Sequence, residues 1–161
     1  MTTTRKPMTR EEAKRYIFAG WSRIDVYNNI SKNMVSFEIT QACSFNGFEV
    51  HMDPNIARYY DVHQGNYWFM GVVDSNAPWR LIPVPKFTVV GQGHTNWMVF
   101  TWLLRVLHNG EPLRKDVEIF ISGIHCACCG KYLKDAKSLK RGFGPHCWKK
   151  IMENERKEVM R

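Results

Sequence analysis

Three cysteines in the last quarter of the chain constrain its fold more than any other feature. Cys126 and Cys129 have the C-x2-C spacing with which two thiolates bind one tetrahedral metal ion from a tight turn. Gly130 suits that turn, because a backbone wrapped around an ion needs a residue that tolerates positive φ. After 17 intervening residues, Cys147 supplies a third thiolate. The spacing therefore predicts a zinc site.

The residues before Cys147 predict the start of a helix. Gly142 and Gly144 make a turn, and Pro145 suits the first helical position, where its missing N–H has no cost. Cys147 then lies in the first turn of a helix that runs to about Met160. The partial positive charge of a helix N-terminus favours a thiolate over a thiol. A knuckle, a loop and a helix in this order are typical of a treble clef.

The fourth ligand is less obvious. A second ligand from the same helix would usually lie at position 150. Here that residue is Lys150, which cannot coordinate a metal ion while it is protonated. His125, Cys128 and His146 are the nearby candidates. Side chains of helical neighbours point about 100° apart, which disfavours His146 beside Cys147, and Cys128 is expected to face away from the ion. We favour His125.

Disulfide or redox chemistry is the alternative interpretation of the cysteines. Residues 1–7 are polar and basic and contain no apolar signal segment. Together with an odd number of cysteines, five, this favours a reducing compartment and a metal site. A thioredoxin-like site needs its C-x2-C at the start of a helix, and the turn after Gly130 does not begin one.

A longer motif around the cysteines resembles a known family. The pattern is C-x2-C-G-[KR]-x-L-x-D-x-x-S-[IL]-x-x-G-[FI]-G-P-x-C. It is matched here by Cys126, Cys129, Gly130, Lys131, Leu133, Asp135, Ser138, Leu139, Gly142, Phe143, Gly144, Pro145 and Cys147. The chain is similar in this motif to an uncharacterised zinc-finger-like family that is frequent in bacteriophage genomes.

The resemblance extends over most of the chain, loosely before residue 90, through residues 18–20 and 116–120. It implies a zinc site, a phage origin and a location in the host cytoplasm, but no established activity. Two departures stand out. Members of the family often have a histidine four residues before the first cysteine, where this chain has Ser122, and residues 52–66 look longer than their counterpart.

Length and composition are those of a globular protein. With 161 residues and 44% hydrophobic residues, the chain can form one domain with a small appended module. No run of about 18 apolar residues indicates a membrane span. We expect a flexible N-terminus at 1–8, a core domain at 9–122 and a zinc-binding module at 123–161.

Local patterns predict an α+β fold, namely a small antiparallel sheet with packed helices and a C-terminal treble-clef-like zinc module. Thr9 and Glu12 match a capping box for a first helix. An apolar stripe predicts a second, core-packed helix at 96–108, capped by Thr95. Strands are expected at 21–27, 34–40, 45–52, 67–73 (as the central strand), 87–90 and 116–121, with turn-rich chain at 53–65 and an irregular connection at 77–93.

The distribution of charge indicates a polyanionic partner. The chain has a net charge of +8, and residues 125–161 hold ten Lys or Arg against four acidic residues. A helix N-terminus and cations near it favour phosphate. Tyr132, Phe143 and Trp148 lie between the charges and are able to stack on unpaired bases. The alternative is that Phe143 and Trp148 pack the zinc core and that the lysines form a solvated face. The predicted nucleic-acid contacts are Lys131, Lys134, Lys137, Lys140, Arg141, Lys149 and Lys150.

We therefore predict a zinc-binding protein that binds nucleic acid, DNA rather than RNA, without sequence specificity. The alternative is a module that binds a host protein such as a polymerase, a nuclease or a defence factor. The histidines form no H-E-x-x-H motif, and no nucleophile elbow, paired-carboxylate or deaminase motif is present, so the sequence predicts no enzyme. A zinc ion held by three cysteines with an open fourth position is the remaining catalytic alternative.

Overall fold

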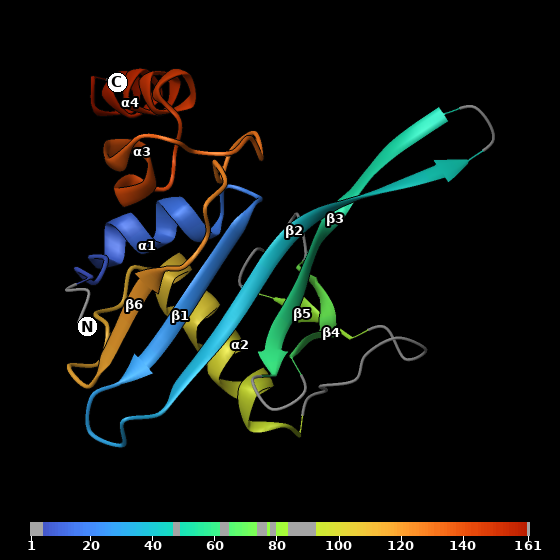
Figure 1. The fold of residues 1–161 in the computed structure, drawn as a ribbon, viewed down its shortest axis with the longest axis vertical. Helices are drawn as coiled ribbons and strands as arrows, with labels where there is room; N and C mark the ends of the chain where they lie inside the picture. The colour runs from blue at the N-terminus through green and yellow to red at the C-terminus, as the bar shows by residue number, and fades with distance from the viewer. Residues whose placement is uncertain are drawn as a thin grey trace.

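A six-stranded antiparallel sheet forms the centre of the molecule (Figure 1). The computed structural model describes residues 5–46, 49–61, 65–73, 77, 80–83 and 93–160. The strands lie in the order β5-β4-β3-β2-β1-β6. Their bounds are β1 Ser22–Asn28, β2 Met34–Asn46, β3 Glu49–Asp61, β4 Asn66–Val73, β5 Leu81–Ile82 and β6 Val117–Ile121. The predicted α+β class is confirmed.

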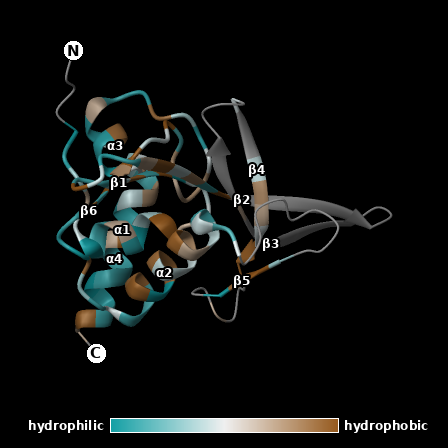
Figure 2. Cartoon of the chain, turned by 90° about the horizontal axis from the view of Figure 1, so that it is seen from below, coloured by the Kyte–Doolittle hydropathy of each residue, from teal (hydrophilic) through white to brown (hydrophobic). Residues whose placement is uncertain are grey.

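Four helices accompany the sheet in the described residues. They are α1 Arg10–Ile17, α2 Thr95–Asn109, α3 Ala136–Arg141 and α4 Pro145–Val159. Hydrophobic residues are prominent in α2 (Figure 2), and the ring of Phe100 in this helix stacks on Phe37 of β2 with 4.7 Å between the centroids. The predicted core helix is confirmed, although its N-cap is His94 rather than Thr95.

The N-terminal helix begins as its sequence indicates. The Thr9 side chain accepts from the backbone N–H of Glu12, and the Glu12 side chain accepts from that of Thr9, which completes the capping box. Residues 5–8 belong to the stretch that we expect to be flexible, and two of them contact the sheet. The Met8 N–H donates to the Ile119 carbonyl, and Arg5 pairs with Asp25 at 2.8 Å.

The sheet departs from the predicted strands in one hairpin. The strand expected at 45–52 spans the reversal between β2 and β3, and most of the turn-rich stretch expected at 53–65 is strand β3. Antiparallel pairing with β2 overrides the turn propensity of Pro54. The register of this pairing shifts between the pairs Gln41–Asn55 and Cys43–Met52, which flank Pro54. A bulge of this kind accommodates the missing N–H of proline. The far end of the hairpin extends away from the helices (Figure 1).

Two further predictions concern the strands expected at 67–73 and 87–90. The strand expected to be central, at 67–73, is β4, which lies second from the edge between β3 and the short β5. The strand expected at 87–90 lies outside the described residues.

The C-terminal module shares its core with the sheet and α1. The buried hydrophobic cluster runs from Tyr16 and Ile119 to Leu133 and Phe143 without interruption. The Tyr16 and Phe143 rings make a T-shaped contact with 6.2 Å between their centroids. The boundary expected between the core domain and the zinc-binding module, at residues 122 and 123, stays a prediction. The hydrophobic core includes residues on both sides of it. In the part of the chain that the structure describes, no helix is long and apolar enough to span a membrane.

Candidate metal centre

A tight turn carries the first two cysteines. The Gly130 N–H donates to the Cys126 carbonyl at 2.9 Å, and the Cys126 N–H donates to the Lys131 carbonyl at 2.7 Å. Gly130 has a φ of 78°, the left-handed conformation that the sequence predicted for it. An antiparallel bridge between His125 and Tyr132 closes the turn. We call residues 125–132 the knuckle.

Two helices return the chain to the knuckle. The sequence analysis missed α3, although the Asp135 side chain caps it by accepting from the Ser138 N–H at 2.9 Å and Gly142 ends it at a φ of 80°. The next helix, α4, begins at Pro145 as predicted, so that Cys147 lies in its first turn. The order of knuckle, short helix and long helix places all three cysteines at one end of α4.

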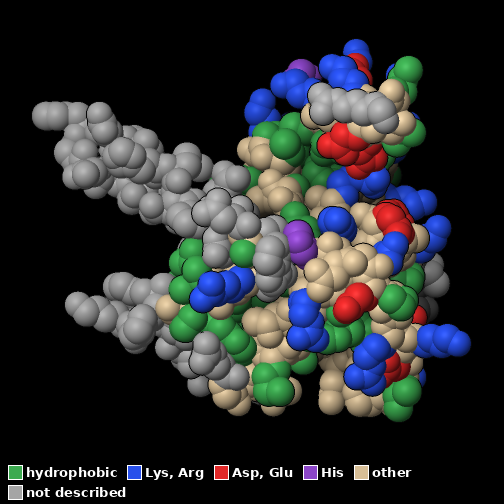
Figure 3. Space-filling view, turned by 180° about the vertical axis from the view of Figure 1, so that it is seen from behind, with side chains coloured by type: hydrophobic (Ala, Val, Ile, Leu, Met, Phe, Trp, Pro, Cys, Tyr) green, Lys and Arg blue, Asp and Glu red, His purple; other side chains and the backbone are tan. Residues whose placement is uncertain are grey.

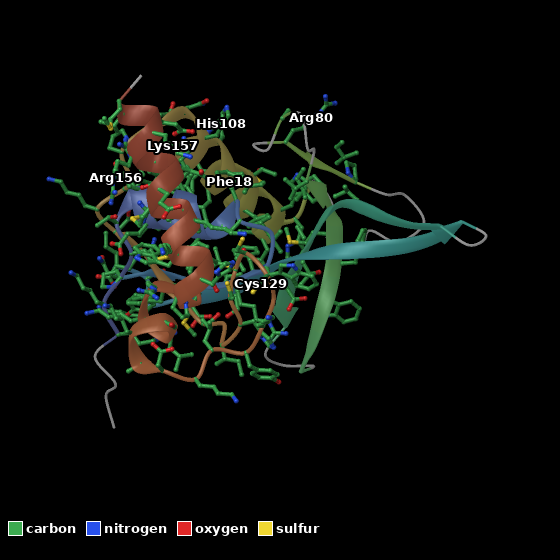
Figure 4. The ribbon with its side chains drawn as sticks, turned by 90° about the horizontal axis from the view of Figure 1, so that it is seen from above. Phe18, Arg80, His108, Cys129, Arg156 and Lys157 are labelled. Atoms are coloured by element: carbon green, nitrogen blue, oxygen red, sulfur yellow. The ribbon has the colours of Figure 1, made fainter. Side chains whose placement is uncertain are left out.

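The three sulfur atoms lie within 4.8 Å of one another. Two Zn–S bonds of about 2.3 Å at a tetrahedral angle place sulfurs about 3.8 Å apart, so an inward shift of at most about 1 Å brings all three onto one ion. Cys126 is fully buried, whereas Cys129 is exposed. Cys129 lies beside one end of α4, and Arg156 and Lys157 lie toward the other (Figure 4). The group can hold a metal ion, as the spacing predicted.

The surroundings of the thiols favour a bound cation. Burial raises the pKa of the Cys126 thiol, but the N–H groups of Gly144, Cys129 and Cys128 that point at its sulfur lower it by more, and the net pKa lies below the ordinary value. Burial, followed by hydrogen bonds with Cys129 and Cys126, raises the pKa of Cys147 to about 12. Without a metal ion, the three-cysteine cluster therefore holds one thiolate more readily than two. A bound cation compensates the negative charge of the second and third thiolates.

Metal binding should therefore weaken as the pH falls. Because a metal displaces the protons of the thiols, each thiol that is protonated in the metal-free protein should change the apparent affinity by about tenfold per pH unit. The raised pKa of Cys147 keeps its proton in place at neutral pH, so its release contributes to the slope. A competition titration with a chromophoric chelator between pH 6 and pH 8 measures this slope, and an affinity independent of pH would contradict it.

His125 does not join the three sulfurs. Among the described residues, the group of close donor atoms contains three cysteines and no histidine. The His125 ring lies 4.3 Å from the Tyr132 ring and lines a separate small cavity beside Glu38. It is His146, with Asp135, that lines the 340 Å³ cavity at the sulfurs. The predicted fourth ligand is therefore not supported by the geometry.

The predicted nucleic-acid contacts fall into two groups. Lys131, Lys134, Lys137, Lys140, Lys149 and Lys150 are exposed. Arg141 is half-buried, and its guanidinium group donates to the Phe143 carbonyl and lies 5.1 Å from the centre of the Trp148 ring. Lys and Arg side chains are prominent at the end of the molecule that contains α3 and α4 (Figure 3, top).

The three aromatic residues of the module differ in their surroundings. Phe143 is 1% exposed and belongs to the core. The Trp148 ring contacts the guanidinium groups of both Arg15 and Arg141. These two rings pack the module, whereas Tyr132 is 67% exposed and is the ring free to meet a ligand.

The sequence analysis also missed the contact that attaches α4 to α1. Arg15 of α1 donates two hydrogen bonds to the Glu155 carboxylate, at 2.8 and 3.1 Å. A pair of residues so far apart in the chain carries no local signal.

Fold and site together define an α+β protein with a C-terminal group of three cysteines that can hold a metal ion. A family model described as "Family of unknown function (DUF6011)" matches residues 125–151, which hold the knuckle, α3 and the first half of α4. The resemblance to an uncharacterised family is thus confirmed for the metal centre. Comparisons with curated proteins and with solved structures find no match.

Proposed function

We propose that this chain is a zinc-binding protein whose C-terminal module binds nucleic acid, DNA more than RNA, without reading its sequence. The observation that carries the proposal is a group of three close sulfur atoms, able to hold one metal ion, in a module whose two helices bear exposed lysines. Thiolates favour zinc among the common divalent ions of cells, although copper(I) and iron share the preference. The ion's proposed role is structural rather than catalytic. The bacteriophage origin that the sequence resemblance implies belongs to the same proposal.

The charge of the module favours a polyanion. Three thiolates and one Zn²⁺ sum to about −1, which leaves most of the positive charge of residues 125–161 uncompensated. Each lysine that neutralises a phosphate releases a counterion, so binding should weaken as salt rises. Gly144 caps α4 without a side-chain hydrogen bond, and the N–H groups at this helix end also favour phosphate.

A charge-reversal variant tests the proposal. Replacement of Lys137, Lys140 and Lys149 by Glu should weaken DNA binding and reduce the slope of log affinity against log salt by roughly three. Fluorescence anisotropy of a labelled oligonucleotide over a series of salt concentrations measures the affinity and its dependence on salt. The matched control replaces Lys6, Lys32 and Lys115, which are exposed outside the module, by Glu. Equal losses in both variants would argue for a general charge effect and against the module as the binding site.

Binding to a protein of the host is the competing outcome. A protein partner should remain bound at a salt concentration that releases nucleic acid, because buried contacts depend less on screening. If the purified protein shows no salt-sensitive binding to DNA or RNA and retains a defined protein partner in high salt, the nucleic-acid proposal fails.

A further inference from the structure

The knuckle presents an exposed aromatic ring on a supporting ring. Tyr132 is 67% exposed, although the next residue, Leu133, is buried in the core. The His125 and Tyr132 rings are 4.3 Å apart at an interplanar angle of 45°, and the backbone bridge between the two residues fixes this arrangement. Tyr132 is therefore held in place by His125 and still accessible to a ligand.

A cavity of about 340 Å³ opens beside this ring. Its walls include Tyr132, Lys131, Lys134 and His146 together with the three cysteines. Pro145, the first residue of α4, also lines it. The cavity thus combines an aromatic surface with two ammonium groups and the positive end of a 15-residue helix. Its volume lies in the range of small-ligand sites, about 300–1,000 Å³.

We propose that this cavity binds one unpaired nucleotide of a single-stranded nucleic acid, with the base stacked on Tyr132 and its phosphate beside Lys131 and Lys134. The proposal rests on the proposed function and adds the form of nucleic acid that the module prefers. Two ammonium groups offset the charge of about −1 of an ion bound by three thiolates and the charge of Asp135, which lines the same cavity, so that a phosphate can approach.

Stacking gives the site a preference for single strands. In a duplex both faces of an internal base are covered by its neighbours, so no base face is available to Tyr132. An unpaired base offers a face to an aromatic side chain, and such stacking tolerates any base. The lysines outside the cavity, such as Lys137 and Lys149, act on phosphates of either form. Replacement of Tyr132 should therefore weaken binding to single strands much more than binding to duplexes, whereas replacement of those lysines should weaken binding to both.

The test compares single-stranded and duplex DNA on the zinc-loaded full-length protein. The Tyr132→Ala variant should lose at least about tenfold in affinity for a labelled oligothymidylate and change by less than about twofold on a blunt duplex at the same salt. Tyr132→Phe keeps the ring and should bind as the wild type does. Met98→Ala, which truncates a side chain that is 61% exposed on α2, is the matched control and should change neither affinity.

The outcomes separate this inference from the proposed function. If the wild-type protein binds neither form, the proposed function itself fails. If the wild-type protein binds and Tyr132→Ala has no effect, or weakens both forms equally, the module still binds nucleic acid but the Tyr132 site is overturned. Metal content measured on each variant shows that the centre is intact.

A second variant tests the supporting ring. His125→Ala should weaken binding of the oligothymidylate, because Tyr132 loses the ring that orients it, while the protein keeps one zinc ion per chain. Loss of the ion in this variant would show that His125 is a metal ligand and would overturn its role as the support of Tyr132. Metal analysis and the binding titration are independent readouts of the two roles.

Discussion

Replacement of Cys147 by Ser should remove the metal ion and destabilise the C-terminal module. Cys147 is 9% exposed, and its sulfur is the one that α4 contributes to the group of three. Structural zinc contributes an apparent binding free energy of about 10–16 kcal/mol in zinc-finger peptides at pH 7, and loss of one of three thiolates forfeits much of it. Metal analysis should show less than one ion per chain, and thermal unfolding should begin at a lower temperature.

Cys128, which precedes Cys129 in the knuckle, provides the matched control. It is exposed and lies outside the group of three sulfurs within 4.8 Å of one another, although its side chain hydrogen-bonds to that of Cys147. Cys128→Ser should therefore retain the ion and the stability of the wild type. Full metal occupancy in Cys147→Ser, or loss of the ion in Cys128→Ser alone, would contradict the ligand set described above.

Replacement of Gly142 by Ala should destabilise the protein by about 2–5 kcal/mol. Gly142 has a φ of 80°, and an added Cβ would lie 2.5 Å from the Tyr16 ring and 3.2 Å from Ile121. The left-handed conformation costs a residue with a Cβ about 1–2 kcal/mol, and overpacking of a core costs about 1–3 kcal/mol more. Tyr16 is 1% exposed and has little space to move. Urea unfolding of the metal-loaded protein measures the loss.

Gly93 is the control for this substitution. A Cβ at Gly93 meets no atom of the described residues within 4 Å, and Gly93 has no positive φ. Gly93→Ala should leave the free energy of unfolding within about 0.5 kcal/mol of the wild-type value. If Gly142→Ala is equally mild, the close packing of Tyr16 on the C-terminal module is not a source of stability.

Features with a local cause were predictable from the sequence. The capping box at Thr9, the left-handed turn at Gly130 and the start of α4 at Pro145 each depend on residues that are neighbours in the chain. The metal centre was predictable for the same reason, because C-x2-C spacing followed by a third cysteine at a helix start encodes its own geometry. These elements needed no knowledge of the rest of the fold.

Features set by distant contacts were not predictable in this way. Pro54 and its neighbours favour a turn, yet pairing of β3 with β2 extends them into a strand with a bulge. His125 has the chemistry of a zinc ligand, but its direction depends on the bridge to Tyr132 across the knuckle. The end of α3 at Gly142 also reflects the space available against Tyr16. In each case tertiary structure decides between local alternatives.

The pairing of Arg15 with Glu155 joins residues that are 140 positions apart. During synthesis, α1 must therefore wait for nearly the whole chain before its partner in α4 emerges, and contacts of such long range form slowly. Capture of an ion by the three cysteines would hold α4 next to the knuckle and so shorten that search. The supply of metal to the newly made chain should then influence the rate at which Arg15 and Glu155 pair, as well as the stability of the finished protein.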